Sequence, residues 1–375
     1  QEYFSDGITE DLITDLSKLS GLLVVARNSA FAYKGNPQDE QSIGRERGVD
    51  YLFKGSVRRS GDRIRVNVRL ADSGNGNNLW AERYDREIGD LFAIQDELTA
   101  QIVSALEIKI IPEDRDRLTR CHVASVQAYD EFLKGLDHYG RRSSENNEFA
   151  KAHYERAIEL DPDFARAYAG LALASSRIVL DGWDLGADDS LERAAQLADK
   201  AERLDPTVPQ IYFVKGQVEL LRRNYEEAIR HAEHAISIKP SYADAHALLG
   251  WILHFAGRPR EGLASMERAV RLNPRVPSIY RMVRGALNYS EGNTELALTD
   301  LVPAVAINPN FQQLRIWLAA AYAAAGRIDD AQWESEEILA LYPEFSVSFV
   351  ETGFPIRDPA YLERFLADLR LAGLP

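Results

Sequence analysis

Hydrophobic residues at the beginning of the chain recur at the spacing of an α-helix. Ile8, Leu12, Leu16 and Leu19 share one face of a segment that runs from residue 5 to 19. This pattern predicts an amphipathic helix. Its acidic residues gather near the amino end and on the polar side, where the helix dipole and water favour them. These acids, expected to lie on the wet face, are Asp6, Glu10, Asp11 and Asp15.

Further along, apolar and polar residues alternate with the period of a β-strand. The alternation covers residues 51–58 and, after the turn sequence Ser60-Gly61-Asp62, residues 63–70. Two such runs joined by a short glycine turn predict an antiparallel hairpin.

Shorter patterns complete this first region. The apolar run at 22–26 predicts a strand buried on both faces, and residues 79–86 predict another strand. Residues 41–48 and 91–106 predict helices, the second long enough to cover a sheet. Residues 1–110 are therefore expected to form a small α/β domain with a mixed sheet.

From residue 127 onward, proline ends an apolar, helix-like run at nearly constant intervals. The successive distances are 44, 34, 34, 35 and 34 residues, which is too regular for independent loops. Small residues at matching places allow the two helices of each repeat to approach closely. The prolines are Pro162, Pro206, Pro240, Pro274, Pro309 and Pro343, and the small residues include Gly216, Gly250, Gly285 and Ala319. These are tetratricopeptide positions, and they predict an all-α superhelix of about six units over residues 127–343.

Three features depart from this regular pattern. About ten extra residues near 177–189 predict a protruding loop or lengthened helices, and Pro303 inside a second helix predicts a kink. In the segment 344–375, Asp358-Pro359 predicts the amino end of a closing helix that caps the apolar end of the stack.

The run of motifs resembles a known family arrangement. FSDGITEDLITDLSKL, LLVVARNSAFAYKG, YLFKGSVRRSGDRIRVNVRL and LWAERYDREIGDLFAIQDELT resemble a TolB-type domain that precedes tetratricopeptide repeats in bacterial class III adenylate/guanylate cyclases and in some winged-helix regulators. The resemblance implies a linker at 111–126 and a strand ahead of the first helix that is missing here, so that the sheet carries a vacant strand position.

The same resemblance implies a function. The chain is expected to be a non-catalytic protein-interaction and regulatory module, the C-terminal region of a class III cyclase whose catalytic domain lies upstream of Gln1. No segment resembles that catalytic domain. The alternatives are the sensor region of a winged-helix transcriptional regulator and a freestanding scaffold, which the upstream sequence would distinguish.

The resemblance also implies which residues line the concave groove of the superhelix. The second, fifth, ninth and twelfth positions of the first helices face inward, and they are mostly apolar or aromatic. A protein or peptide ligand is expected to bind there through apolar side chains. The expected peptide-binding residues are Arg166, Phe213, Gln217, Asp244, Trp251, His254, Met282, Tyr289 and Gln313. The alternative is that these aromatics fill gaps between neighbouring helices.

Composition and charge narrow the partners. The formal net charge of −14 disfavours general affinity for nucleic acid or anionic lipid, and no apolar run is long enough to span a membrane. The single cysteine fits a reducing compartment, so the cytoplasm is expected. Self-association through the vacant strand position stays possible.

No residue pattern predicts catalysis, a metal or another cofactor. His231 and His234 lie three residues apart on a second helix, but no third ligand is evident. Cys121 and His122 are adjacent, which points their side chains apart.

One basic pattern has no assigned role. Arg63, Arg65 and Arg69 share one side of a hairpin strand, with Lys54 and Arg58 nearby. A solvated face or the docking of an acidic partner explains it better than nucleic-acid binding, because no aromatic residues are interleaved.

Overall fold

The structure is a computed structural model, and it describes residues 2–19, 22–25, 27–31, 33–34, 39–106, 125–141, 143–180 and 188–375. The chain divides into two units. Unit 1 comprises Gln1–Ala174, Leu197–Val208 and Ile238–Ser241, and unit 2 comprises Ser175–Gln196, Pro209–Ser237 and Tyr242–Pro375. The expected linker at 111–126, except its last two residues, and the Cys121-His122 pair lie outside the described residues, as do 181–187 of the expected insertion.

The sheet of unit 1 has three described strands in the order β1-β2-β3, namely β1 (Tyr51–Ser60), β2 (Arg63–Asp72) and β3 (Asn78–Glu87). Both pairings are antiparallel, so the predicted hairpin is confirmed. The described strands therefore form an antiparallel sheet, whereas a mixed sheet was expected. The turn between β1 and β2 uses Gly61 at φ 59°, a left-handed conformation that glycine adopts without a steric penalty. Ile64, Val66, Val68 and Leu70 of β2 are buried on one face of the sheet.

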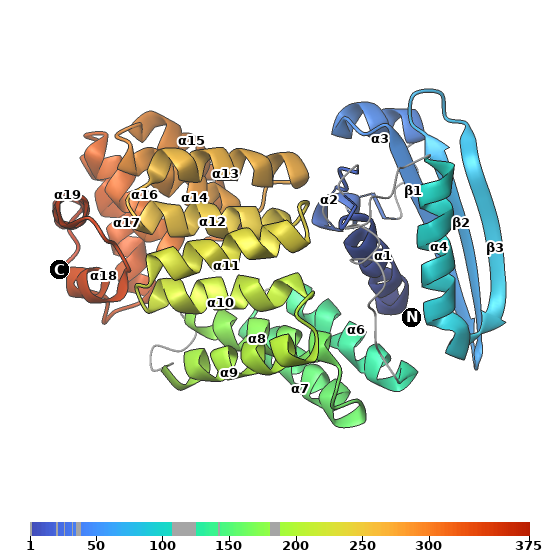
Figure 1. The fold of residues 1–375 in the computed structure, drawn as a ribbon. Coiled ribbons are helices and arrows are strands. Elements are labelled where there is room, and N and C mark those ends of the chain that lie inside the picture. Colours follow the sequence, from blue (N-terminus) through green and yellow to red (C-terminus); the bar gives the residue numbers. More distant parts are fainter. Residues whose placement is uncertain are drawn as a thin grey trace. The chain divides into compact units, whose positions relative to one another are not determined.

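Helices cover that face (Figure 1). The described helical segments of this region are α1 (Glu2–Leu16), α2 (Arg27–Phe31), α3 (Glu40–Arg47), the 3-10 turn η1 (Ile88–Asp90) and α4 (Leu91–Ala105), of which α1, α3 and α4 contact the strands. The predicted strand at 22–26 is wrong for the described residues 22–25, which are irregular. Leu22 and Val24 pack beside Leu16 and Ile102, whereas Leu23 is exposed. The run thus buries side chains against helices without forming a strand, an ambiguity that short apolar runs carry.

The repeat helices begin with α6 (Val126–Gly140) and α7 (Ser144–Leu160), which belong to unit 1. The division between the units passes through α8 (Ala165–Leu180) and α9 (Asp188–Leu204). These two helices have 16 and 17 residues, against 13 and 14 in the following pairs, so the insertion includes lengthened helices.

A buried polar network lies between the sheet domain and the first repeat helices inside unit 1. The Asp11 carboxylate of α1 accepts hydrogen bonds from the Tyr129 hydroxyl of α6 and from Gln95 Nε2 of α4, the latter at 3.1 Å, and it forms an ion pair with Arg166 of α8. Asp11 is 5% exposed, so its expected place on the wet face is wrong. The periodicity identified the polar side of α1 but could not show that α6 and α8 cover part of it.

Unit 2 is built from antiparallel helix pairs. The first helices are α10 (Pro209–Leu221), α12 (Ala243–Phe255), α14 (Ser278–Ser290) and α16 (Gln312–Ala324). The second helices are α11 (Tyr225–Ile238), α13 (Pro259–Leu272), α15 (Thr294–Ile307) and α17 (Ile328–Leu341). Pro303 lies inside α15, which continues to Ile307.

Small residues set the distance between the helices of a pair. A Cβ on Gly250 would lie 3.0 Å from the Met266 side chain and 3.2 Å from the Gly262 carbonyl oxygen. On Gly285 it would lie 2.6 Å from Leu301, closer than real Cβ contacts allow. The predicted close approach at these positions is confirmed.

Two helices follow the last pair, α18 (Val347–Gly353) and α19 (Pro359–Leu371). Asp358 is the N-cap of α19, since its carboxylate accepts a hydrogen bond from the Ala360 backbone N–H at 3.0 Å, and Pro359 occupies the first turn. This end of the closing helix is as predicted.

The buried network predicts a large effect of removing one charge. Asp11→Ala removes the buried carboxylate that pairs with Arg166 and accepts from the Tyr129 hydroxyl, and we expect the free energy of unfolding to fall by about 3–5 kcal/mol. Urea denaturation would measure it. The matched control is Glu148→Ala, because Glu148 is 61% exposed and pairs only across one helix turn with Lys151, so its loss should cost less than about 1 kcal/mol. Equal effects of the two substitutions would contradict the stabilising role of the network.

Candidate protein-interaction surface

The candidate surface is the side of unit 2 formed by the first helices α10, α12, α14 and α16, here called the A-helix surface. Eight of the nine predicted peptide-binding residues lie in unit 2. The ninth, Arg166, lies in unit 1, where it pairs with Asp11 and stacks over the Phe132 ring at 4.8 Å. The structure therefore gives Arg166 a role inside unit 1.

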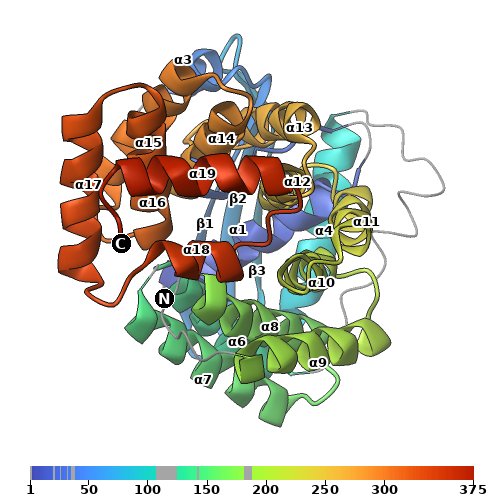
Figure 2. The same cartoon turned by 90° about the vertical axis from the view of Figure 1, so that its left-hand side faces the viewer.

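The C-terminal segment, residues 344–375, covers the carboxyl-terminal ends of α12 and α14 and the middle of α16. Figure 2 shows α19 running across these helices with α18 beside it. The Phe365 ring stacks on Trp317 of α16 at 4.3 Å, and Tyr361 meets His254 of α12 edge-on at 5.6 Å. The expected cap is present, but it packs against several first helices instead of only the end of the stack.

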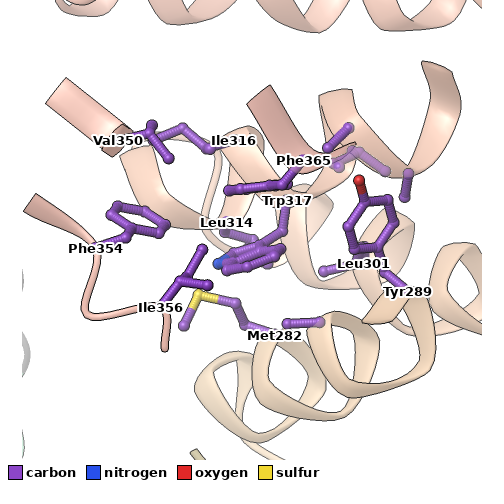
Figure 3. Close-up of a cluster of buried hydrophobic side chains, with 14 of the residues drawn as sticks. Met282, Tyr289, Leu301, Leu314, Ile316, Trp317, Val350, Phe354, Ile356 and Phe365 are labelled. Atoms are coloured by element: carbon purple, nitrogen blue, oxygen red, sulfur yellow. The ribbon is translucent and has the colours of Figure 1, made fainter. Parts of the chain in front are cut away.

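Trp317 is the centre of this packing (Figure 3). The indole is fully buried and contacts rings from both sides, Trp251 on α12 and Phe354 and Phe365 of the C-terminal segment. Aromatic side chains bury large areas, so this cluster contributes strongly to the stability of unit 2. Trp317 was not among the predicted site residues. The apolar spacing of the C-terminal segment was the available signal, because an amphipathic helix there must pack its apolar side on another helix.

Polar contacts fix the segment at several points. The Arg223 guanidinium donates to the carbonyl oxygens of Thr352 at 2.9 Å and Phe354 at 3.1 Å. The Arg357 backbone N–H donates to the Phe255 carbonyl oxygen at 3.0 Å, and its side chain pairs with Glu226. Arg223 has φ 62°, the one positive value among the described non-glycine residues, and this conformation ends α10 where the guanidinium reaches the segment.

Four of the predicted site residues belong to the covered part. His254, Met282 and Tyr289 are 2%, 0% and 2% exposed, and Trp251 is partly buried and stacked on His254 at 5.1 Å. The Tyr289 hydroxyl donates a hydrogen bond to the Asp368 carboxylate of α19 at 2.5 Å. His254 and Tyr289 contact the C-terminal segment directly, so a partner could reach these two side chains only where the segment had moved away.

The other four predicted residues are Phe213, Gln217, Asp244 and Gln313. Phe213 of α10 is partly buried, and its ring packs on Tyr242 at 5.7 Å. Gln217 accepts a hydrogen bond from the Ser176 hydroxyl at 3.0 Å, and the exposed Asp244 accepts one from the Tyr280 hydroxyl at 2.6 Å. Gln313 is partly buried at the start of α16.

We define the open patch as four of these neighbouring residues, Phe213, Gln217, Tyr242 and Asp244. Tyr242 was not predicted, because it precedes the helix from which inward positions were counted.

Burial changes the acid–base behaviour of the covered part. It lowers the pKa of His254 to about 3, because the imidazolium would be desolvated, and Nδ1 has no hydrogen-bond partner among the described residues. Burial also raises the pKa of Asp368 above its ordinary value, against the opposing effects of the Tyr289 hydrogen bond and Arg364. These shifts belong to a packed core and not to a catalytic site.

Other candidate chemistry finds no support in the part of the chain that the structure describes. No group of three metal-ligating side chains occurs there, and His231 and His234 both contact the Tyr212 ring. None of the described helices is long and apolar enough to cross a membrane.

Comparisons with known proteins agree with this architecture. Residues 182–243 and 222–277 match the family model described as tetratricopeptide repeat. A protein of Rhizobium meliloti (strain 1021) named "Putative adenylate cyclase 3" is 40% identical over 235 residues, which are 63% of this chain and 39% of that relative. The chain thus spans well under half of the relative's length.

Two solved structures are similar to this chain. A thermophilic TPR protein of Thermus thermophilus has 20% identity and a TM-score of 0.42, and the similarity covers 52% of this chain and 98% of that one. A monomeric mutant of IFIT1 has 15% identity and a TM-score of 0.51, covering 76% of this chain and 74% of that one. The helical region is a tetratricopeptide repeat array.

The buried imidazole predicts acid sensitivity. Because the pKa of His254 is about 3 in the folded chain and about 6.5 when unfolded, the neutral ring stabilises the fold fully above pH 6.5. Between pH 6.5 and about 3 the unfolded chain binds the extra proton, so the free energy of unfolding should fall by up to about 1.4 kcal/mol per pH unit.

Urea denaturation at pH 7, 6, 5 and 4.5 would measure this slope. His254→Gln should lower the slope of the free energy of unfolding against pH by the contribution of one proton. His234→Gln, at an exposed position of α11, should leave the slope as in the wild type. Identical slopes in the wild type and His254→Gln would show that this imidazole does not cause the sensitivity.

Proposed function

We propose that the chain is a non-catalytic protein-interaction and regulatory module that works in the cytoplasm as part of a class III adenylate/guanylate cyclase. Its partner is a protein or peptide that binds the A-helix surface. The single observation that carries this proposal is the open patch, which presents an aromatic pair beside an exposed carboxylate and an amide on a tetratricopeptide array.

The chemistry of the open patch indicates the ligand. Phe213 and Tyr242 offer apolar ring surface to one side chain of a peptide, as binding sites with few polar groups usually do. Asp244 accepts hydrogen bonds, so a lysine, an arginine or a backbone N–H of the ligand fits beside it. Gln313, in the same layer of first helices, is a further proposed contact. Trp251, His254, Met282 and Tyr289 would join only if the C-terminal segment were displaced.

Two findings support the link to a cyclase. The relative of 40% identity is named as an adenylate cyclase, and the first 110 residues resemble the TolB-type domain of that family. The name favours a cyclase over a winged-helix regulator as the parent protein. In this proposal the catalytic domain is a separate fold, and the present chain adds recognition.

Replacing the ring at the open patch should weaken partner binding. Peptides selected by phage display on the wild-type chain would be labelled, and their dissociation constants measured by fluorescence anisotropy. Phe213→Ala should raise the dissociation constant about tenfold, which corresponds to about 1.4 kcal/mol, as for an aromatic anchor. Trp333→Ala is the matched control, because Trp333 is 62% exposed on the second helix α17. If both variants bind as the wild type does, the open patch is not the site.

The absence of catalysis is tested directly. The purified chain incubated with ATP or GTP and manganese should form no cyclic nucleotide above the level without protein, measured by chromatography. Turnover that scales with protein concentration would refute the non-catalytic assignment.

A further inference from the structure

The sheet of unit 1 has one face that carries mostly cations. The register places Lys54 and Arg58 of β1, Arg63, Arg65 and Arg69 of β2, and Arg83 of β3 on the side opposite the buried Ile64, Val66 and Val68. We call these six residues the basic sheet face. The buried side faces α1 and α4, and Figure 1 shows no helix over the other side.

The arrangement of these cations is unfavourable for the sheet itself. Lys54 lies directly opposite Arg69, and Arg58 lies directly opposite Arg65. Like charges at directly opposed positions of antiparallel strands repel and destabilise the pairing. Thr, Val or an acid at either place would avoid the repulsion. An unfavourable pair of like charges that gains no packing in return is typical of a functional surface.

The carboxylates nearby compensate only in part. Glu40 is shared by Lys54 at 2.8 Å and Arg69 at 2.6 Å, and Asp85 is shared by Arg63 at 3.1 Å and Arg65 at 2.5 Å. Asp85 also lies 3.9 Å from Arg83, and Glu87 lies opposite Arg63 in the register, so three acids neighbour the six cations of the face. Arg58 is exposed and forms no ion pair with any described residue. The face keeps a net positive charge on a chain whose formal net charge is −14.

The groups on the face select among anionic partners. The aromatic residues of β3, Trp80 and Tyr84, pair with Leu70 and Val66 and so lie on the buried side, which leaves no ring for base stacking. The chain's negative charge repels a long polyanion at a distance. Guanidinium groups, in contrast, bind carboxylates through two parallel hydrogen bonds.

The spacing of the cations suggests the conformation of the ligand. Arg63, Arg65 and Arg69 lie on the same face of one strand. The Cα atoms of Arg63 and Arg65 are therefore about 6.6–7 Å apart along the strand, and those of Arg65 and Arg69 are about twice as far apart. Acidic residues at every second position of an extended chain have the same repeat. We propose that the basic sheet face binds an extended acidic segment of a partner protein, with Asp or Glu at alternate positions. This site is independent of the A-helix surface.

The probe is a fluorescein-labelled 12-residue peptide of alternating Asp and Thr, and binding to the full chain is followed by anisotropy. Arg58→Glu should raise the dissociation constant at least tenfold. The same substitution removes the repulsion with Arg65, so Tm should stay unchanged or rise by about 1–3 °C. Weaker binding with undiminished stability separates a binding role from a structural one.

Arg268→Glu is the matched control, because it makes the same change of charge at an exposed position of α13 in unit 2. It should leave the affinity unchanged. Equal loss in both variants, or equal binding of a peptide with six Asp followed by six Thr, would reduce the effect to net charge and overturn the proposal. Tighter binding of a 12-nucleotide oligouridine than of the alternating peptide would also overturn it. So would a concentration-dependent dimer in sedimentation velocity that Arg58→Glu abolishes, since the occupant would then be a second copy.

Discussion

A helix pair of this array cannot bury its apolar side alone, and that constraint determines the carboxyl-terminal half of the molecule. In the interior of the array the next pair supplies the cover, and Leu287 of α14 can approach α13 closely because Gly262 has no side chain. After α17 the chain turns back, and α18 and α19 cover α16, α14 and α12 instead. The aromatic cluster around Trp317 is the result.

The same cover limits where a ligand can bind. His254, Met282 and Tyr289 were expected to line the groove, and in the structure their side chains are buried in unit 2. The open patch lies elsewhere, on α10 and at the start of α12, where the Phe213–Tyr242 pair lies near Asp244. Core packing thus uses part of the A-helix surface, and only the rest is available for the proposed partner.

Much of the fold could be predicted from the sequence because local patterns determine it. The period of two with a glycine turn specified the hairpin, the proline spacing specified the helix pairs, and Asp358-Pro359 specified the start of α19. The candidate site was harder. Periodicity shows which side of a helix is apolar, but it does not show what covers that side, so the packing of Phe365 on Trp317 could not be foreseen. For the same reason Asp11 was placed in water although α6 and α8 surround it.

The way α19 packs restricts how the array can evolve. Its side chains meet three successive first helices at once, through Tyr361 on α12, Asp368 on α14 and Phe365 on α16. Packed helices lie about 8–10 Å apart, so gaining or losing a unit between α14 and α17 would move one partner by that distance and break the match. The returning helix therefore restricts the number of helix pairs that can lie between α12 and α16.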